Sequence, residues 1–306
     1  MDKKEFEALL DKKVSEVEDI LNRHLPEPKG LQKTVLESME YSCLAGGKRL
    51  RPIILTESYK LFSGSDELPF EVESFAAAIE FIHSYSLVHD DLPAMDNDEF
   101  RRGRLTTWKV YGDGMGVLSG DALLNYAFET VFKSALQTED AVRLKRIAKA
   151  GAVLSEKSGS FGMIGGQCAD LEAEGRGSDV TIGDLLFIHE HKTACLIEAA
   201  LMVGGILGGA DEKEIEILKK IGSNVGIAFQ IRDDILDVIG NTEELGKKTG
   251  SDAQNDKVTY VTLKGIEESE SEAESLSKEA EELLKSLPGD KDFLSMLIDS
   301  LIGRMR

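Results

Sequence analysis

The chain has 306 residues, of which 42% are hydrophobic, and its formal net charge is −20. Such an acidic chain argues against nucleic acid as a partner, because that binding depends on Lys and Arg neutralising phosphates. The apolar content allows a large core, and prolines are scarce, with no Pro- or Gly/Ser-rich linker. These features favour one domain that spans residues 1–306.

The N-terminus and the cysteines indicate where the chain resides. Residues 1–5 open an amphipathic pattern rather than a signal peptide. The cysteines, Cys43, Cys168 and Cys195, are widely spaced and odd in number. That usage is typical of free thiols in a reducing compartment, so we expect a cytoplasmic protein without a disulfide framework.

Most of the chain repeats its apolar residues every three or four positions, which is the helical period. No run of alternating strand-like residues persists, so the pattern predicts an all-α bundle of about ten or more helices at ordinary helix lengths. Glycine, proline and polar clusters predict the breaks between helices, at residues 26–30, 63–65, 175–178, 240–257 and 287–289.

The most apolar stretch covers residues 194–210 and contains Glu198 and four glycines. It falls short of the ~20 apolar residues that a membrane span requires, so we expect a buried helix and no membrane span. Gly204, Gly205, Gly208 and Gly209 would let another backbone approach it closely.

A basic group follows the first helices, in the segment Gly46-Gly47-Lys48-Arg49-Leu50-Arg51-Pro52. The glycine pair can free backbone N–H groups for an anion, and Arg recognises phosphate in a bidentate manner. The segment therefore predicts an anion site, although we expect some of the basic residues to be ordinary surface charges, namely Arg49, Arg104 and Lys248.

The first of two aspartate clusters contains Asp90, Asp91 and Asp96. Pro93 is expected to end or distort a helix here, because it lacks an N–H donor and clashes with the preceding turn. Asp96 could then fold back beside Asp90. Arg101 and Arg102 follow the cluster closely.

The second cluster contains Asp233, Asp234 and Asp237. Asp233 and Asp237 are four positions apart, so on a helix they share one face while Asp234 points elsewhere. Basic residues again follow, at Lys247, Lys248 and Lys257.

The two clusters together predict a site for hard cations. Buried carboxylates need compensation, and oxygen-only ligands favour Mg²⁺, Mn²⁺ or Ca²⁺ over zinc. Several Mg²⁺ ions, for which Mn²⁺ could substitute, would use a phosphate or diphosphate as the bridging ligand. A single Asp pair is more often a solvated helix end, but two clusters that are each followed by basic residues are not. The sequence thus predicts two anion sites, one bridged by metal and one purely basic.

These motifs resemble the trans-isoprenyl diphosphate synthases, specifically the short-chain bacterial type. The matching segments occur in the family's order over about residues 40–265: residues 44–52, 83–89 leading into the first cluster, 101–103, 120–123, 165–167, 191–193, 229–234, 245–247 and 256–260. Trp108, Leu105 and Val261 depart from the commonest pattern, which concerns local loop shape rather than a proposed ligand.

The resemblance implies an all-helical bundle around a deep central cavity, usually in a homodimer. Such enzymes join an allylic diphosphate to isopentenyl diphosphate head-to-tail, through Mg²⁺-assisted ionisation to an allylic cation. No side-chain nucleophile is needed. Developing charge on the diphosphate would be stabilised by Mg²⁺ and a ring of Lys and Arg.

Roles carry over from the family position by position. The principal Mg²⁺ ligands would be Asp90, Asp96 and Asp233, supported by Asp91, Asp234 and Asp237. The allylic diphosphate would be contacted by Arg101, Lys192, Lys247 and Lys257. Isopentenyl diphosphate would be held by Lys48, Arg51, His83 and Arg102. The reacting carbons would be lined by Thr193 and Gln230.

Tyr85 stands at the fifth position before the first cluster. In the family an aromatic residue there goes with shorter products, so we expect a C15 product, farnesyl diphosphate, with a C20 product as the alternative. Tyr85 could instead simply pack in the core, with its hydroxyl bonded to a neighbour.

Other classes fit the sequence less well. A terpene cyclase or a metal-dependent phosphohydrolase would share the acidic sites but would not need the pocket of Lys48, Arg51 and His83. A non-catalytic prenyltransferase subunit would be expected to lack one of the two clusters. The pair Gly165-Gly166 has no neighbouring Lys or Arg, so it predicts close helix packing rather than phosphate binding.

Overall fold

The computed structural model describes residues 1–239 and 258–303, and these are helical apart from one short hairpin. The first helices are α1 (Lys3–His24), α2 (Lys33–Cys43), α3 (Leu50–Ser63), α4 (Phe70–Asp90), α5 (Thr107–Tyr111), α6 (Asp113–Ala135), α7 (Ala141–Ser158) and α8 (Met163–Glu174). They are followed by the 3₁₀ turn η1 (Gly177–Asp179), α9 (Ile182–Ile188), the π-helix η2 (His189–Ala194), α10 (Cys195–Gly208), α11 (Glu212–Ile239), α14 (Tyr260–Lys264), α15 (Ile266–Lys285) and α16 (Asp292–Leu301). The hairpin pairs β1 (Phe100–Arg101) with β2 (Arg104–Leu105).

The all-α prediction is confirmed, and so are most of the predicted breaks. Helices end at or beside the segments 26–30, 63–65, 175–178 and 287–289, as the glycine and proline signals indicate. The remaining predicted break, residues 240–257, lies outside the described residues. The free thiols expected from the spacing are also found, with Cys43 and Cys195 buried and Cys168 exposed.

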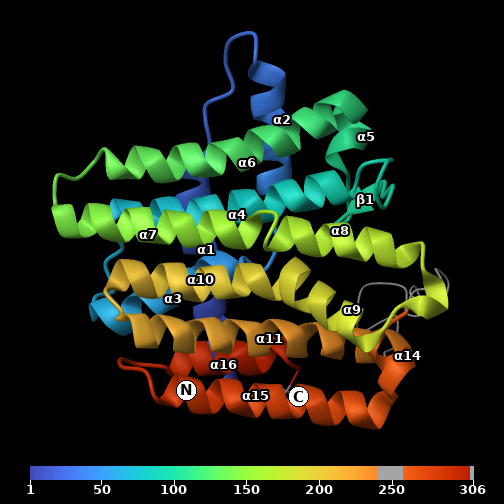
Figure 1. Cartoon of the computed structure of the whole chain (residues 1–306). Helices are drawn as coiled ribbons and strands as arrows, with labels where there is room; N and C mark the ends of the chain where they lie inside the picture. Colours follow the sequence, from blue (N-terminus) through green and yellow to red (C-terminus); the bar gives the residue numbers. More distant parts are fainter. Residues whose placement is uncertain (240–257, 304–306) are drawn as a thin grey trace.

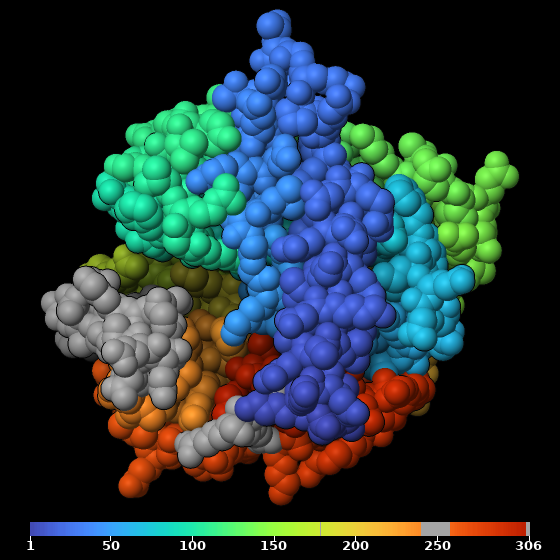
Figure 2. All heavy atoms as spheres, turned by 180° about the vertical axis from the view of Figure 1, so that it is seen from behind, coloured from blue at the N-terminus to red at the C-terminus, as the bar shows by residue number. Residues whose placement is uncertain are grey.

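The helices form stacked layers (Figure 1). Helix α6 packs on α4, α10 packs between α3, α7 and α11, and α15 covers α11 on the far side. Helix α1 lies across the back of these layers, where it contacts α3 and α4 (Figure 2). Because the stack buries α4 and α10 on several sides, their residues are almost wholly apolar or paired.

Helix α10 is the most deeply buried element, and every residue in it is buried. A Cβ on Gly204 would lie 2.2 Å from the Leu55 carbonyl oxygen, and one on Gly208 would lie 2.6 Å from that of Tyr59. Only glycine permits this approach of α10 to α3, as predicted. The continuous helical stretch Ile182–Gly208 is long and apolar enough to cross a membrane, but 83% of its most apolar window is buried inside the protein, as in a core helix.

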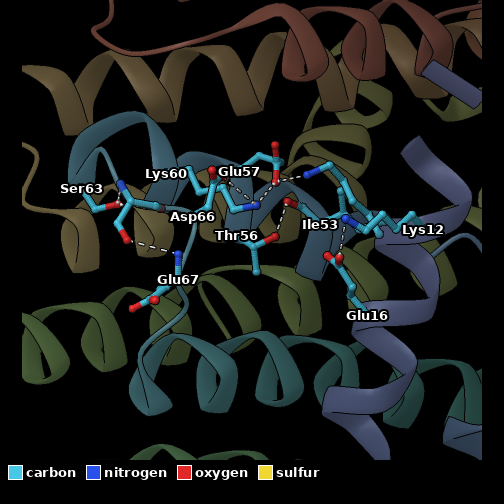
Figure 3. Close-up of polar contacts among 11 residues, drawn as sticks. Lys12, Glu16, Ile53, Thr56, Glu57, Lys60, Ser63, Asp66 and Glu67 are labelled. Atoms are coloured by element: carbon cyan, nitrogen blue, oxygen red, sulfur yellow. Dashed lines mark hydrogen bonds and ion pairs between the residues drawn. The ribbon is translucent and has the colours of Figure 1, made fainter. Parts of the chain in front are cut away.

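A cavity of about 880 Å³ lies between α1, the end of α3 and the start of α4. Its charged walls are largely paired (Figure 3). Glu57 accepts from Lys13 at 2.6 Å and from Lys60 at 3.2 Å, and Lys12 lies 3.5 Å from Glu16. This cavity is lined by Glu73 near the start of α4, about 25 Å along the helix from Asp90 at 1.5 Å per residue. It is therefore separate from the aspartate clusters.

Candidate active site

A second cavity, of about 670 Å³, brings together six of the residues predicted for function. Its walls come from the end of α4, the start of α3, α6, α8 and η2. The predicted site residues that line it are Arg51, His83, Tyr85, Asp90, Lys192 and Thr193. The remaining wall is largely apolar and includes Leu124, Met163, Ile164 and Leu171. One end of this cavity is thus charged while its body suits a hydrocarbon.

The first aspartate cluster begins where α4 ends, at Asp90, three residues before Pro93. The backbone N–H of Asp96 donates to the carbonyl oxygen of Asp90 at 2.9 Å, so the chain folds back as the sequence predicted. Asp91 turns inward instead. It is 3% exposed and accepts from Arg101, with Nε at 2.7 Å and Nη2 at 2.6 Å.

The β1–β2 hairpin delivers Arg101 and Arg102 to the site. Its turn places Arg102 at a φ of 51°, in the left-handed region. The Arg102 Nη1 group donates to the Gly46 carbonyl oxygen, which joins the hairpin to the glycine-marked basic segment. Gly47 has a φ of 131°, a conformation that favours glycine, and a Cβ there would lie 2.5 Å from Arg102 Nη1. Two segments predicted to hold the same diphosphate are thus tied together.

The basic side chains of the segment before α3 differ in how far they are buried. Lys48 is exposed, Arg51 is half-buried and lines the cavity, and Arg49 between them is only 3% exposed. The expectation that Arg49 is an ordinary surface charge is wrong, because its guanidinium is paired with the buried Glu80. Arg104 is exposed as expected, and Lys248 lies outside the described residues.

Two ionisable groups of the cavity have shifted pKa values. Burial, together with the neighbouring Arg51 and Arg102, holds the pKa of His83 well below its usual value, so its imidazole is neutral at pH 7. Burial raises the pKa of Asp90 to about 6; Lys192 opposes the shift and Asp96 adds to it. The cavity therefore holds a carboxylate that a cation would stabilise.

The π-helix η2 presents Lys192 and Thr193 to the cavity. A Cβ on Gly166 of α8 would lie 2.1 Å from the Lys192 backbone nitrogen, so the predicted role of Gly165-Gly166 in close packing is confirmed at Gly166. Single π-helical turns often occur at functional sites. Lys192 Nζ also lies 2.5 Å from Oδ2 of the buried Asp170.

Asp170 was not predicted as a site residue. It lies on α8 one turn after Gln167, in the same glycine-marked segment, and that helical spacing was the only sequence signal for it. It orients the Lys192 ammonium at the cavity wall. We therefore add Asp170 to the residues that shape this site.

The second cluster lies near the end of α11, where Asp233 is exposed and Asp237 half-buried. Asp234 accepts from the Tyr260 backbone N–H at 2.8 Å, and its Oδ2 lies 3.9 Å from His189 Nε2. Asp234 therefore anchors the start of α14 to α11. Gln230 is half-buried one turn before Asp233 and does not belong to the described lining of the cavity.

Two predicted phosphate ligands, Lys247 and Lys257, lie outside the described residues. Within residues 1–239 and 258–303, no three His, Cys, Asp or Glu side chains are grouped closely enough to hold a metal. The carboxylate oxygens nevertheless suit a hard cation. Burial and the neighbouring Asp96 destabilise the ionised form of Asp90, and a bound cation would offset that effect.

Tyr85 lines the cavity from α4, two residues after His83, which is the first residue of α4 to do so. It is 5% exposed, and its hydroxyl has no hydrogen-bond partner among the described residues. The core-packing alternative is therefore confirmed in part, because the ring belongs to the hydrophobic core but its hydroxyl is not bonded to a described neighbour. Burial raises the pKa of Tyr85 to about 12.

An all-helical stack around a cavity with acidic, basic and apolar walls is the architecture of an isoprenoid-forming enzyme. Comparison with known families agrees, since residues 32–292 match the polyprenyl synthetase model. The chain belongs to the polyprenyl synthetase family, and within it to the trans-isoprenyl diphosphate synthases, as its motifs predicted. Its trans-prenyltransferase activity is supported by the same match.

Curated relatives carry two product names. The chain is 43% identical over 288 residues to the geranylgeranyl diphosphate synthase of Cyanophora paradoxa, which covers 94% of this chain and 93% of the relative. It is 42% identical over 289 residues to the farnesyl diphosphate synthase of Micrococcus luteus, with 94% of each covered. Family membership therefore does not decide product length.

Solved structures share the fold over nearly the whole chain. The geranylgeranyl pyrophosphate synthetase of Pyrococcus horikoshii has a TM-score of 0.86 at 31% identity, covering 98% of this chain and 99% of that one. A geranyltransferase from Helicobacter pylori, complexed with magnesium and isoprenyl diphosphate, has a TM-score of 0.78 at 31% identity, covering 97% and 96%.

Asp90→Asn should stabilise the metal-free protein in a pH-dependent way. The folded-state pKa of about 6 lies above the ordinary value of 3.8, so folding disfavours the ionised form. The penalty is absent below pH 4 and complete above pH 6. We expect a gain on the order of 1–2 kcal/mol at pH 8 and none at pH 4, measured by urea unfolding in a chelator.

The exposed Asp11→Asn provides the control for removing one negative charge from an acidic chain. A similar gain in the Asp11 variant, or a gain at Asp90 that is equal at both pH values, would contradict the assignment of the penalty to burial of Asp90.

Proposed function

We propose that the chain is a farnesyl diphosphate synthase, or geranyltranstransferase. It would condense isopentenyl diphosphate head-to-tail with dimethylallyl and then geranyl diphosphate, releasing diphosphate. The supporting observation is that one cavity is lined by Arg51, Asp90 and Lys192, by apolar side chains of α6 and α8, and by Tyr85. Residues 1–306 would act as one polyprenyl synthase domain.

Several Mg²⁺ ions would be held by carboxylates of both clusters. Asp90, Asp96 and Asp233 are the proposed principal ligands, with support from Asp91, Asp234 and Asp237, and Mn²⁺ is the expected replacement. Bound Mg²⁺ supplies electrostatic stabilisation of the leaving diphosphate. The ion pair of Asp91 with Arg101 suggests that Asp91 acts mainly by fixing that arginine.

The two diphosphates would bind to different basic groups. Lys48, Arg51, His83 and Arg102 are assigned to isopentenyl diphosphate, and the neutral His83 would contribute a hydrogen bond rather than a charge. Arg101 and Lys192, with Lys247 and Lys257, are assigned to the allylic diphosphate. Keeping the sites apart lets the isopentenyl double bond face the allylic carbon.

The allylic cation needs polar oxygens near it and no water. Thr193 lines the cavity on η2, and we assign its hydroxyl to the reacting carbons together with the Gln230 amide oxygen. The apolar wall formed by Leu124, Ile164 and Leu171 would exclude water from the cation. The departing diphosphate, held by Arg101 and Lys192, is placed to take the proton that the new C–C bond releases.

A C20 product is the second candidate, because the relatives of similar identity are named for both products. A terpene cyclase is disfavoured by the basic group of Arg51, His83 and Arg102, which a second diphosphate requires. A non-catalytic subunit is disfavoured by the presence of both aspartate clusters.

We also propose a homodimer formed through α6. One side of this helix carries exposed apolar residues, with exposed fractions of 44% for Val117, 53% for Leu118, 70% for Phe132 and 83% for Leu136. Exposed apolar side chains that gather on one helix favour an interface there. A second copy could cover it by a two-fold contact of α6 with itself.

The first test is a product assay. Purified protein is incubated with Mg²⁺, isopentenyl diphosphate and either dimethylallyl or geranyl diphosphate, and the dephosphorylated alcohols are sized. We expect a C15 alcohol, and Asp233→Ala should lower turnover by about a hundredfold or more because Mg²⁺ ligation is lost. Absence of any condensation product would sink the enzyme proposal, and a dominant C20 alcohol would replace C15 by C20.

Tyr85→Ala should lengthen the product by one isoprene unit. Removing the ring opens the cavity toward Phe81, one helical turn, or about 5.4 Å, earlier on α4. Phe81 is fully buried against Tyr126, with ring centroids 5.7 Å apart, so the extension should stop there. Chromatography of the alcohols should show mainly C20, with Tyr85→Phe remaining at C15; an unchanged C15 profile in the alanine variant would exclude Tyr85 as the floor.

Phe132→Asp should disrupt the dimer. A charge placed on this side of α6 would be buried without a partner on association. Sedimentation velocity should show a dimer for the unmodified chain and a monomer for this variant, while Leu31→Asp, at an exposed residue outside α6, should stay dimeric. A monomeric unmodified chain would refute the proposed assembly.

A further inference from the structure

Arg49 lies between two residues assigned to isopentenyl diphosphate, yet it faces the other way. Its φ of 48° places it in the left-handed region, which is uncommon for a residue other than glycine. This conformation directs its side chain into the core, where it is 1% exposed, while Lys48 beside it stays in solvent. A strongly basic group is thus buried directly behind the proposed substrate site.

The guanidinium of Arg49 connects three helices. Its Nη1 donates to Glu80 Oε1 on α4 at 2.8 Å, and its Nη2 lies 3.6 Å from Glu18 Oε1 on α1. Arg49 itself precedes the first residue of α3. Its Nε and Nη2 atoms are buried without a hydrogen bond to any described residue. Such an incompletely satisfied ion pair is weak evidence for a role in stability alone, because desolvating the charges offsets their attraction.

Glu80 faces more than one cation. It raises the pKa of both Arg51 and Arg102, against the lowering effect of their burial. Yet Glu80, which is 2% exposed, forms its ion pair with Arg49. The buried Arg51 Nε has no hydrogen-bond partner among the described residues. Arg51 is therefore close enough to interact electrostatically with Glu80, while it still lines the cavity.

We propose that Arg49 is a positioning residue that occupies Glu80 and so leaves Arg51 directed at isopentenyl diphosphate. Without Arg49, the buried Glu80 would lack a partner, and a buried carboxylate requires one. Arg51, two residues along the same turn, would then be drawn inward to Glu80 and away from the substrate. This inference rests on the proposed function, because it assigns a task within the isopentenyl diphosphate site.

The role of Arg49 can be tested by comparing the KM values of the two substrates and by adding a second mutation at Glu80. Arg49→Met should raise the KM for isopentenyl diphosphate about tenfold and leave that for geranyl diphosphate within about twofold, because only the former uses Arg51. Adding Glu80→Gln should recover most of the loss, since a neutral amide does not compete for Arg51. Arg49→Lys keeps the charge and should lie between.

The matched control is Arg143→Met, which breaks the Arg143–Glu71 ion pair at the opposite end of α4. It should leave both KM values unchanged. Circular dichroism confirms folding at the assay temperature, and calorimetry with isopentenyl diphosphate measures affinity independently of turnover. An equal rise of both KM values, or no recovery in the Arg49→Met/Glu80→Gln double variant, would overturn the role of Arg49.

The outcome for the unmodified chain separates this inference from the proposed function. If that chain condenses the substrates and Arg49→Met binds isopentenyl diphosphate normally, only the positioning role fails. If it neither condenses nor binds isopentenyl diphosphate, the proposed function fails and the positioning role falls with it.

Discussion

The site depends on one constraint, which is that α4 carries carboxylates through the middle of an apolar core. Glu80 is buried at mid-helix, and Asp90 and Asp91 follow at its end. Each requires a cation, because a buried charge without compensation is strongly disfavoured. Glu80 has Arg49 and Asp91 has Arg101, whereas Asp90 has only partial help from Lys192 and Arg101. The least compensated of these carboxylates is therefore the one that we propose as a principal metal ligand.

The same constraint explains why remote segments converge on the end of α4. The segment before α3 brings Arg49, the hairpin brings Arg101, and η2 brings Lys192. The first two of these contacts also fix a segment that carries a second basic residue. Thus Arg51 follows from the placement of Arg49, and Arg102 from that of Arg101. The proposed substrate site would then result from the neutralisation of one helix.

Much of this arrangement could be predicted from local sequence. The ends of helices follow Gly and Pro, the return of Asp96 to Asp90 follows from Pro93, and the close packing of α10 follows from its glycines. These features are predictable because each depends on the conformational limits of a few adjacent residues.

Features that depend on long-range packing could not be predicted. The pattern Lys48-Arg49 does not reveal which cation turns inward, since that depends on Glu80, 31 positions away. The extra residue per turn in η2, which sets the direction of Lys192, reflects its contact with Gly166 of α8. Asp170 was missed for the same reason, because its role exists only through Lys192.

Product length is a different kind of problem, because relatives of similar identity are named for farnesyl and for geranylgeranyl diphosphate. Tyr85 belongs to α4, whose next turns inward, at Phe81 and Ile82, are fully buried. A floor mounted on such a helix cannot retreat to admit a longer chain without displacing close-packed side chains. Its buried hydroxyl has no partner among the described residues, which leaves ring volume as the property that a growing chain would meet. Because α4 is buried and its charges are neutralised, it would hold Tyr85 rigidly, and this one side chain could then determine product length.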